Sequence, residues 1–143
     1  MDNTVKDTIM LSEETLTKKE DTRITNIKFE IEDIQKFISS QAYYNKAQEL
    51  HKDNKLNDAI NFYKKAISLK PDYVEAYFNI GKILYSLGKY YYAIEAFNAV
   101  ISLKPNYFLA YHFFGLSIQK GCFVESKPHL HSSIIKLLQK PNL

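Results

Sequence analysis

The chain has 143 residues, of which 45% are hydrophobic and 24% are charged, so it is long enough and apolar enough to bury the core of one domain. It contains only four Gly, four Pro and one Cys, which favours long helices over a turn-rich β-fold and excludes a framework of disulfides. The net charge of +3 is small and its lysines are scattered, which argues against a nucleic-acid-binding protein.

The beginning of the chain differs in charge from the rest. Residues 1–39 carry a net charge of −3 and residues 40–143 a net charge of +6, which fits either a tail that docks on its own chain or an acidic partner. Residues 1–23 are polar and of mixed charge, so we predict a disordered tail there. The chain has neither an apolar segment typical of a signal peptide nor the roughly 18 apolar residues of a membrane span. We therefore expect a cytoplasmic protein with no membrane partner.

Residues 24–39 predict an N-terminal amphipathic helix. Isoleucines recur at spacings of three and four residues and form one stripe: Ile24, Ile27, Ile31, Ile34 and Ile38. The spacing fits a coiled-coil seam over about two heptads. Three interpretations stay open: the helix packs on the domain that follows it, pairs with another copy, or docks reversibly in a groove of its own chain.

The remainder, 40–143, contains an internal repeat. The segment Ile-Ser-Leu-Lys-Pro-Asp-Tyr at 67–73 returns as Ile-Ser-Leu-Lys-Pro-Asn-Tyr at 101–107. Small residues are expected where two helices cross closely, aromatic residues between neighbouring helices, and prolines where the second helix of a unit has ended. These predicted packing residues are Tyr43, Ala47, Ala59, Tyr63 and Pro71 in the first unit, Tyr77, Gly81, Ala93, Phe97 and Pro105 in the second, and Tyr111 and Gly115 in the third.

The repeat predicts helices at about 42–53, 56–69, 74–87, 90–103, 108–120 and 127–139. Gly88 stands where the first helix of its unit should end, which suits a left-handed C-terminal cap. Gly121 is expected to mark the corresponding turn of the third unit. That unit is degenerate, because Ser126 and Leu130 stand in the places of Ala93 and Phe97.

The units resemble tetratricopeptide repeats, whose pattern is aromatic, large, small and large, followed by Ala, aromatic and Pro. Lys46 departs from it, because the family has an apolar residue at that position. The resemblance divides the domain into repeats at 40–73, 74–107 and 108–143. It implies an all-α fold, a short α-solenoid of helix-turn-helix units preceded by the N-terminal helix. The first helices of such a stack line a concave groove that commonly binds an extended peptide.

The predicted groove residues lie on the first helices, opposite the packing residues. They are Tyr44, Asn45, Gln48, Phe78, Asn79, Lys82, His112, Phe113 and Leu116. Asn45 and Asn79 occupy equivalent positions of successive repeats and resemble the asparagine ladder in the repeat domain of O-linked N-acetylglucosamine transferase, in which side-chain amides hold a peptide backbone. The alternative is that both amides are simply solvated. The carboxylate clamp of heat-shock-chaperone adaptors is not expected, because only Asn79 matches it.

No motif predicts catalysis. The sequence lacks a phosphate-binding Gly loop, a Cys-x-x-Cys pair and His-Glu-x-x-His. His129 and His131 are two residues apart, a spacing that predicts different faces of a helix and argues against a metal site. We therefore expect no catalytic residues, no metal and no cofactor.

The main functional hypothesis is an adaptor or scaffold that binds a protein or peptide partner. The alternative is a dedicated secretion chaperone, because the size, layout and repeat count resemble those of the class II chaperones of type III secretion. A regulatory piece of a transferase and a relic of a longer repeat array are further possibilities. A homodimer through the terminal helices is also expected, because the last predicted helix carries an apolar stripe of Leu130, Ile134, Leu137 and Leu138.

Overall fold

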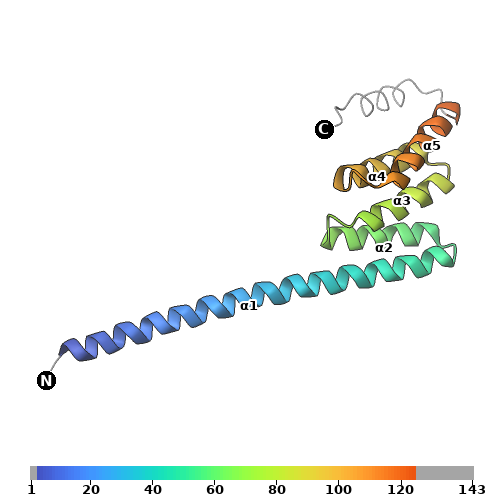
Figure 1. Cartoon of the computed structure of the whole chain (residues 1–143). Helices are drawn as coiled ribbons and strands as arrows, with labels where there is room; N and C mark the ends of the chain where they lie inside the picture. Colours follow the sequence, from blue (N-terminus) through green and yellow to red (C-terminus); the bar gives the residue numbers. More distant parts are fainter. Residues whose placement is uncertain (1–2, 125–143) are drawn as a thin grey trace. The chain divides into compact units, whose positions relative to one another are not determined.

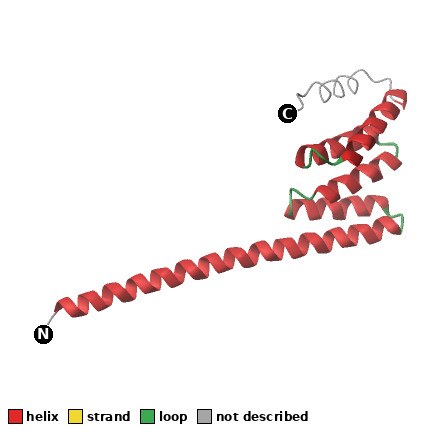
Figure 2. Cartoon of the chain, viewed as in Figure 1, coloured by secondary structure: helices red, strands yellow, loops and turns green. Residues whose placement is uncertain are grey.

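The structure, a computed structural model, describes residues 3–124, and every regular element in that range is an α-helix (Figures 1 and 2). In chain order the helices are α1 (Asn3–Lys52), α2 (Leu56–Leu69), α3 (Val74–Ser86), α4 (Tyr90–Leu103) and α5 (Phe108–Val124). Helices α2 to α5 each pack against the next one along the chain. The predicted all-α repeat fold is confirmed. The predicted last helix, 127–139, lies outside the described residues.

The chain divides into two compact units between Ile38 and Ser39. The described part of the first unit is the N-terminal stretch of α1, whereas the second unit contains the end of α1 and all of α2 to α5.

Helix α1 differs from the sequence-based expectation in two respects. It is helical from Asn3, where a disordered tail over 1–23 was expected, and it continues unbroken through two predicted helices. The physical reason is that residues 3–52 contain no Gly or Pro, the residues that most readily interrupt the backbone hydrogen bonds of a helix. Thr8 and Thr15 add side-chain hydrogen bonds, at 2.7 and 2.6 Å, to the carbonyl oxygens four residues earlier.

Two turns use left-handed residues at equivalent places in successive repeats. Gly88 has φ of +74°, which confirms the predicted cap, and Asn54, its counterpart in the preceding repeat, has φ of +60°. After each of them the next backbone N–H closes the turn, from Lys55 to the Leu50 carbonyl at 2.8 Å and from Lys89 to the Leu84 carbonyl at 2.9 Å. Asparagine tolerates this conformation better than other residues with a side chain, so the repeat keeps its turn without a second glycine.

The turn expected at Gly121 is wrong, because α5 continues through it to Val124. A glycine inside a helix costs only about 1 kcal/mol relative to alanine, which neighbouring residues readily offset. A Cβ at Gly121 would lie 3.4 Å from Cβ of Tyr90, so this part of α5 runs close to the start of α4.

The core of the second unit begins where α1, α2 and α3 meet. Ala47 and Ala59 are both fully buried, and so is the ring of Tyr63, at 1% exposed. Small side chains on facing helices let the helix backbones approach, and the aromatic ring fills the space beside them. Tyr44 from α1 packs edge-on against Tyr63 at 5.5 Å and stacks on Tyr73 at 4.8 Å. These contacts hold the end of α1 against the two following elements.

A second core of aromatic rings joins α3, α4 and α5. Phe97 of α4 is fully buried, stacks on Phe113 of α5 at 5.6 Å and meets Phe78 of α3 edge-on at 5.8 Å. Phe78 and Phe113 also contact one another at 5.8 Å, so the three rings form a closed cluster. Gly81 lies against the Phe97 ring, and a Cβ built at Gly81 would come within 2.6 Å of it.

Candidate functional site

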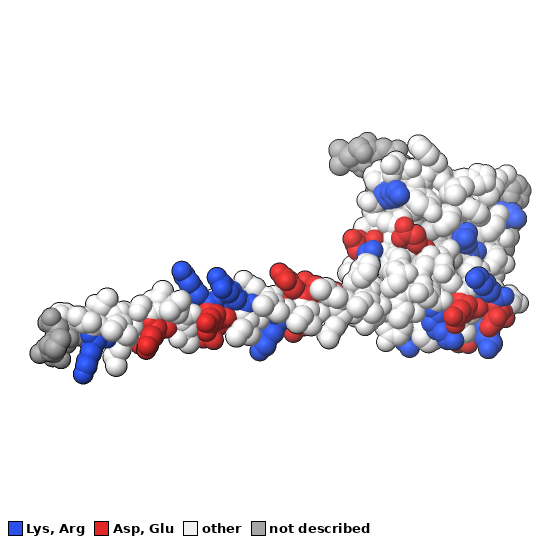
Figure 3. All heavy atoms as spheres, turned by 60° about the horizontal axis from the view of Figure 1, so that its bottom comes forward, with Lys and Arg blue, Asp and Glu red and all other residues white. Residues whose placement is uncertain are grey.

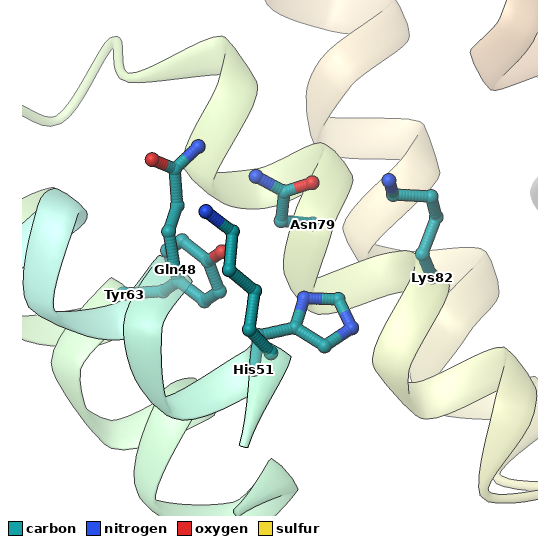
Figure 4. Close-up of a pocket in the computed structure, with 6 residues that line it drawn as sticks. Gln48, His51, Tyr63, Asn79 and Lys82 are labelled. Carbon is teal, nitrogen blue, oxygen red and sulfur yellow. The ribbon is translucent and has the colours of Figure 1, made fainter. Parts of the chain in front are cut away.

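A polar concavity of the second unit lies where α1, α2 and α3 meet. We call it the α1–α3 hollow; its volume is about 430 Å³, and its lining residues are Gln48, His51, Lys52, Tyr63, Asn79 and Lys82 (Figure 4). It draws side chains from three helices, which the packing of Ala47, Ala59 and Tyr63 holds together.

Helical spacing explains why these residues converge. Gln48, His51 and Lys52 are three and four residues apart on α1, and Asn79 and Lys82 are three apart on α3, so each set shares one helix face. In Figure 4 the imidazole of His51 extends from α1 toward α3, which carries Asn79 and Lys82.

The hydroxyl of Tyr44 positions the two amides of the hollow. Its Oη accepts hydrogen bonds from Gln48 Nε2 at 3.2 Å and from Asn79 Nδ2 at 3.1 Å. Burial raises the pKa of Tyr44, so the hydroxyl stays protonated at neutral pH. Each amide carries two N–H groups and a carbonyl oxygen, so these bonds leave polar atoms of both side chains for a further partner.

The charge of the hollow is positive. It is lined by Lys52 and Lys82, and none of its described lining residues is Asp or Glu. Burial, and secondarily the charge of Lys82, lowers the pKa of His51, so this imidazole is neutral at pH 7. Burial raises the pKa of Tyr63 to about 12, which keeps the phenol neutral as well. The hollow therefore offers hydrogen-bond donors and cations.

The structure brings together only part of the predicted groove. Gln48, Asn79 and Lys82 line the hollow, and Tyr44 contacts two of them. Asn45 does not line it; its side chain is exposed and accepts a hydrogen bond from Gln41 Nε2 at 3.1 Å. The two asparagines of the predicted ladder therefore do not share this hollow.

The prediction that Phe78 faces the groove is wrong, because this side chain is only 7% exposed and belongs to the aromatic core. Phe113 is half-buried in the same cluster. Aromatic rings gain more free energy from packing on one another than from facing water, which overrides their position on the helix. Leu116 is half-buried, and His112 is exposed beside Phe113, at 5.7 Å between ring centroids. Neither of these two lines the α1–α3 hollow.

The predicted packing residues fall into three groups. Buried in the structure are Ala47, Ala59, Tyr63, Gly81, Ala93 and Phe97, and half-buried are Tyr43 and Tyr77. Pro71 and Pro105 are exposed in the loops after α2 and α4. In the third repeat, Tyr111 is 42% exposed, and no atom of the described residues lies within 4 Å of a Cβ position at Gly115, which differs from the expectation. The helix that the pattern pairs with them, 127–139, lies outside the described residues.

Sequence reasoning missed three lining residues. His51 and Lys52 follow Gln48 by three and four positions, so extending the predicted groove face by one helical turn includes them. Tyr63 was predicted as a packing residue only, whereas in the structure it belongs to the core and also lines the hollow.

A second concavity, of about 320 Å³, lies among α2, α3 and α4 and is more apolar; we call it the α2–α4 hollow. Its lining residues are Lys64, Ile67, Tyr77, Ile80, Leu84, Tyr92, Glu95, Ala96 and Ala99. In residues 3–124 no group of His, Cys, Asp and Glu has the arrangement of a metal site. No helix of the described range is both long and apolar enough to span a bilayer.

Comparisons with known proteins agree with this architecture. Two family models match the chain: "TPR repeat" over residues 47–88 and "Tetratricopeptide repeat" over residues 74–107. Two crystal structures of the MamA protein are similar at 29% sequence identity and a TM-score of 0.57, over 71% of this chain. The match covers 52% and 56% of the MamA chains, so this chain spans about half their length. A comparison with curated protein sequences returned no match.

Proposed function

Since the chain belongs to the tetratricopeptide-repeat family and is therefore a protein–protein interaction module, we propose that it binds an extended segment of its partner in the α1–α3 hollow. The observation that carries the proposal is the convergence of two amides, two ammonium groups and an imidazole from helices α1 and α3 in one concavity.

The chemistry of the hollow suits the backbone of an extended peptide. Such a backbone presents N–H and C=O groups in alternation, and a side-chain amide can both donate to one and accept from the other. Tyr44 holds the Gln48 and Asn79 amides in place through hydrogen bonds of 3.2 and 3.1 Å. Groups that are fixed before binding lose less conformational entropy when the partner arrives.

The two asparagines provide the first test. Peptides selected from a random-sequence library on the intact protein should bind Asn79→Ala more weakly by about 1–3 kcal/mol, because truncation leaves backbone groups of the peptide unpaired. The double variant Asn45→Ala/Asn79→Ala should lose more only if Asn45 contacts the same peptide beyond the hollow. Isothermal titration calorimetry measures both losses.

Asn61→Ala is the matched control, because Asn61 is an exposed asparagine of α2 that does not line the hollow. It should bind the selected peptides with unchanged affinity. Unchanged affinity of a folded Asn79→Ala variant would contradict the proposal. If the chain is a secretion chaperone, we expect it to use the same hollow. Its partner would be unfolded when free, which would distinguish a chaperone from an adaptor.

The exposed stripe of the N-terminal helix supports a second contact, with another copy of the chain. Along this helix the isoleucines from Ile24 to Ile38 are 48–59% exposed. Residues 18–28 carry four basic and two acidic side chains, whereas 30–36 carry three acidic and one basic, and Figure 3 shows both signs along this helix. An antiparallel second copy would place each basic stretch beside an acidic one while covering both apolar stripes. We therefore propose a homodimer through this stripe.

Light scattering tests the homodimer. The intact protein should have about twice the chain mass of 16.7 kDa, and Ile27→Gln/Ile31→Gln/Ile34→Gln should reduce it to the monomer mass. The control Thr22→Gln/Thr25→Gln/Asn26→Gln changes three uncharged polar residues of the same helix, keeps the isoleucines and the charged residues, and should leave the mass unchanged. A monomeric intact protein at micromolar concentration would refute this contact without affecting the peptide proposal.

A further inference from the structure

The cations of the α1–α3 hollow have no acidic partner among the described residues. Within residues 3–124, Lys36 pairs with Asp33 and Lys46 with Glu49, and neither pair involves the hollow. Lys82 lies with its Nζ 5.2 Å from the ring centroid of Phe78, which supports its side chain without neutralising it. Two lysines of a concave polar site are thus available to an anion from outside.

We propose that the α1–α3 hollow selects a partner segment that carries a glutamate or aspartate. The carboxylate of that residue would lie between Lys82, Lys52 and His51. This proposal rests on the proposed peptide binding and names the chemistry of its ligand. A carboxylate accepts hydrogen bonds from ammonium and imidazole donors, and it would supply the charge that the lining lacks. The basic balance of residues 40–143, a net charge of +6, would also attract an acidic partner.

The surroundings of the hollow set a direction for the segment. Glu75 lies four residues before Asn79 on α3, and its negative charge acts on Tyr44 and Tyr73. An acidic side chain is therefore disfavoured at the Glu75 end and favoured near Lys82, which lies beyond Asn79 on the same helix. The selected segments should carry their acidic residue at one defined position, with neutral or basic residues on the side that meets Glu75.

His51 makes the binding of such a segment depend on pH. The titratable groups that line the hollow with His51 are Lys82 on α3, Lys52 on its own helix and the neutral phenol of Tyr63 on α2. Burial and Lys82 lower the pKa of His51 in the free protein. A bound carboxylate favours the imidazolium and raises that pKa, so binding takes up a proton. Affinity should therefore rise as the pH falls from about 7.5 to about 6 and fall again near the pKa of a free carboxyl group, about 4.

The test begins with the peptides selected from the random-sequence library, synthesised with amidated C-termini. They should be enriched in Glu or Asp at one position, and replacing that residue by Gln or Asn should weaken binding about 3- to 10-fold. Lys82→Gln should weaken binding of the acidic peptide by the same factor. It should leave the affinity for the Gln or Asn version of that peptide unchanged. Lys64→Gln removes an equal charge at the α2–α4 hollow and should have no effect.

The pH dependence supplies a second readout that a change in folding would not produce. The acidic peptide should bind more tightly at about pH 6 than at about pH 7.5, and His51→Gln should abolish that difference while keeping most of the affinity at the higher pH. Peptides that bind the hollow without acidic enrichment would overturn this inference and leave the proposed function standing. Peptides that bind only with a free C-terminus would also overturn it. If no selected peptide loses affinity in Asn79→Ala, the proposed function itself fails.

Discussion

Replacing Gly81 by alanine is expected to destabilise the second unit by about 1–3 kcal/mol, and leucine should destabilise it further. The sign is informative, because glycine to alanine within a helix ordinarily stabilises by up to about 1 kcal/mol. Here the added Cβ would lie 2.6, 2.8 and 2.9 Å from three ring atoms of Phe97. That ring is fully buried between Phe78 and Phe113 and cannot move aside without displacing them.

Gly115→Ala is the matched control for Gly81. Gly115 is also a helical glycine, and no atom of residues 3–124 lies within 4 Å of its Cβ position. Alanine there should leave the free energy of unfolding unchanged or raise it by up to about 1 kcal/mol. Urea denaturation followed by circular dichroism measures both variants. A Gly81→Ala protein as stable as Gly115→Ala would show that α3 and α4 do not cross at this glycine.

The largest single loss of stability is expected for Phe97→Ala, about 3–5 kcal/mol. Phe97 is fully buried at the centre of the rings that join α3, α4 and α5, so its removal leaves a cavity and separates Phe78 from Phe113. Near-ultraviolet circular dichroism and urea denaturation report the loss of the cluster and of stability.

Phe108→Ala is the control, because it makes the same truncation at an exposed position. Phe108 is 80% exposed, so its truncation should change the free energy of unfolding by no more than about 0.5 kcal/mol. Equal stabilities of the Phe97 and Phe108 variants would contradict the assignment of Phe97 to the centre of the second core.

The internal repeat of the sequence predicts the fold because one set of contacts recurs from unit to unit. The bounds of α2 and α4 follow from it, and so does the left-handed Gly88, since prolines and a glycine mark the ends of helices by local sterics. The left-handed conformation of Asn54, at the equivalent position of the first repeat, could be predicted only by recognising that asparagine replaces glycine there.

The parts that the sequence did not predict depend on contacts between helices or on weak local preferences. A glycine signals a turn only if its helix ends there, and α5 passes Gly121. Polar composition suggests disorder over 1–23, yet a stretch without Gly or Pro can still form a helix, as α1 does. Helical spacing placed Phe78 on the groove face, whereas ring packing with Phe97 draws it into the core.

In the candidate site, too, features set within one helix could be predicted, whereas features set by contacts between helices could not. Spacing along α1 and α3 predicted Gln48, Asn79 and Lys82, since each follows from its own helix. The hydrogen bond from Asn79 to Tyr44 joins α3 to α1, so it could be found only from the folded structure. The positive charge of the hollow arises likewise from Lys52 and Lys82 on different helices.

The most direct test of peptide binding in the α1–α3 hollow is the nuclear magnetic resonance spectrum of the ¹⁵N-labelled protein during titration with a selected peptide. The side-chain NH₂ signals of Gln48 and Asn79 should shift most and saturate together, accompanied by the backbone amides of His51 and Lys82. Saturable shifts centred on Tyr77 and Tyr92 of the α2–α4 hollow, with unmoved Gln48 and Asn79 side chains, would contradict the account.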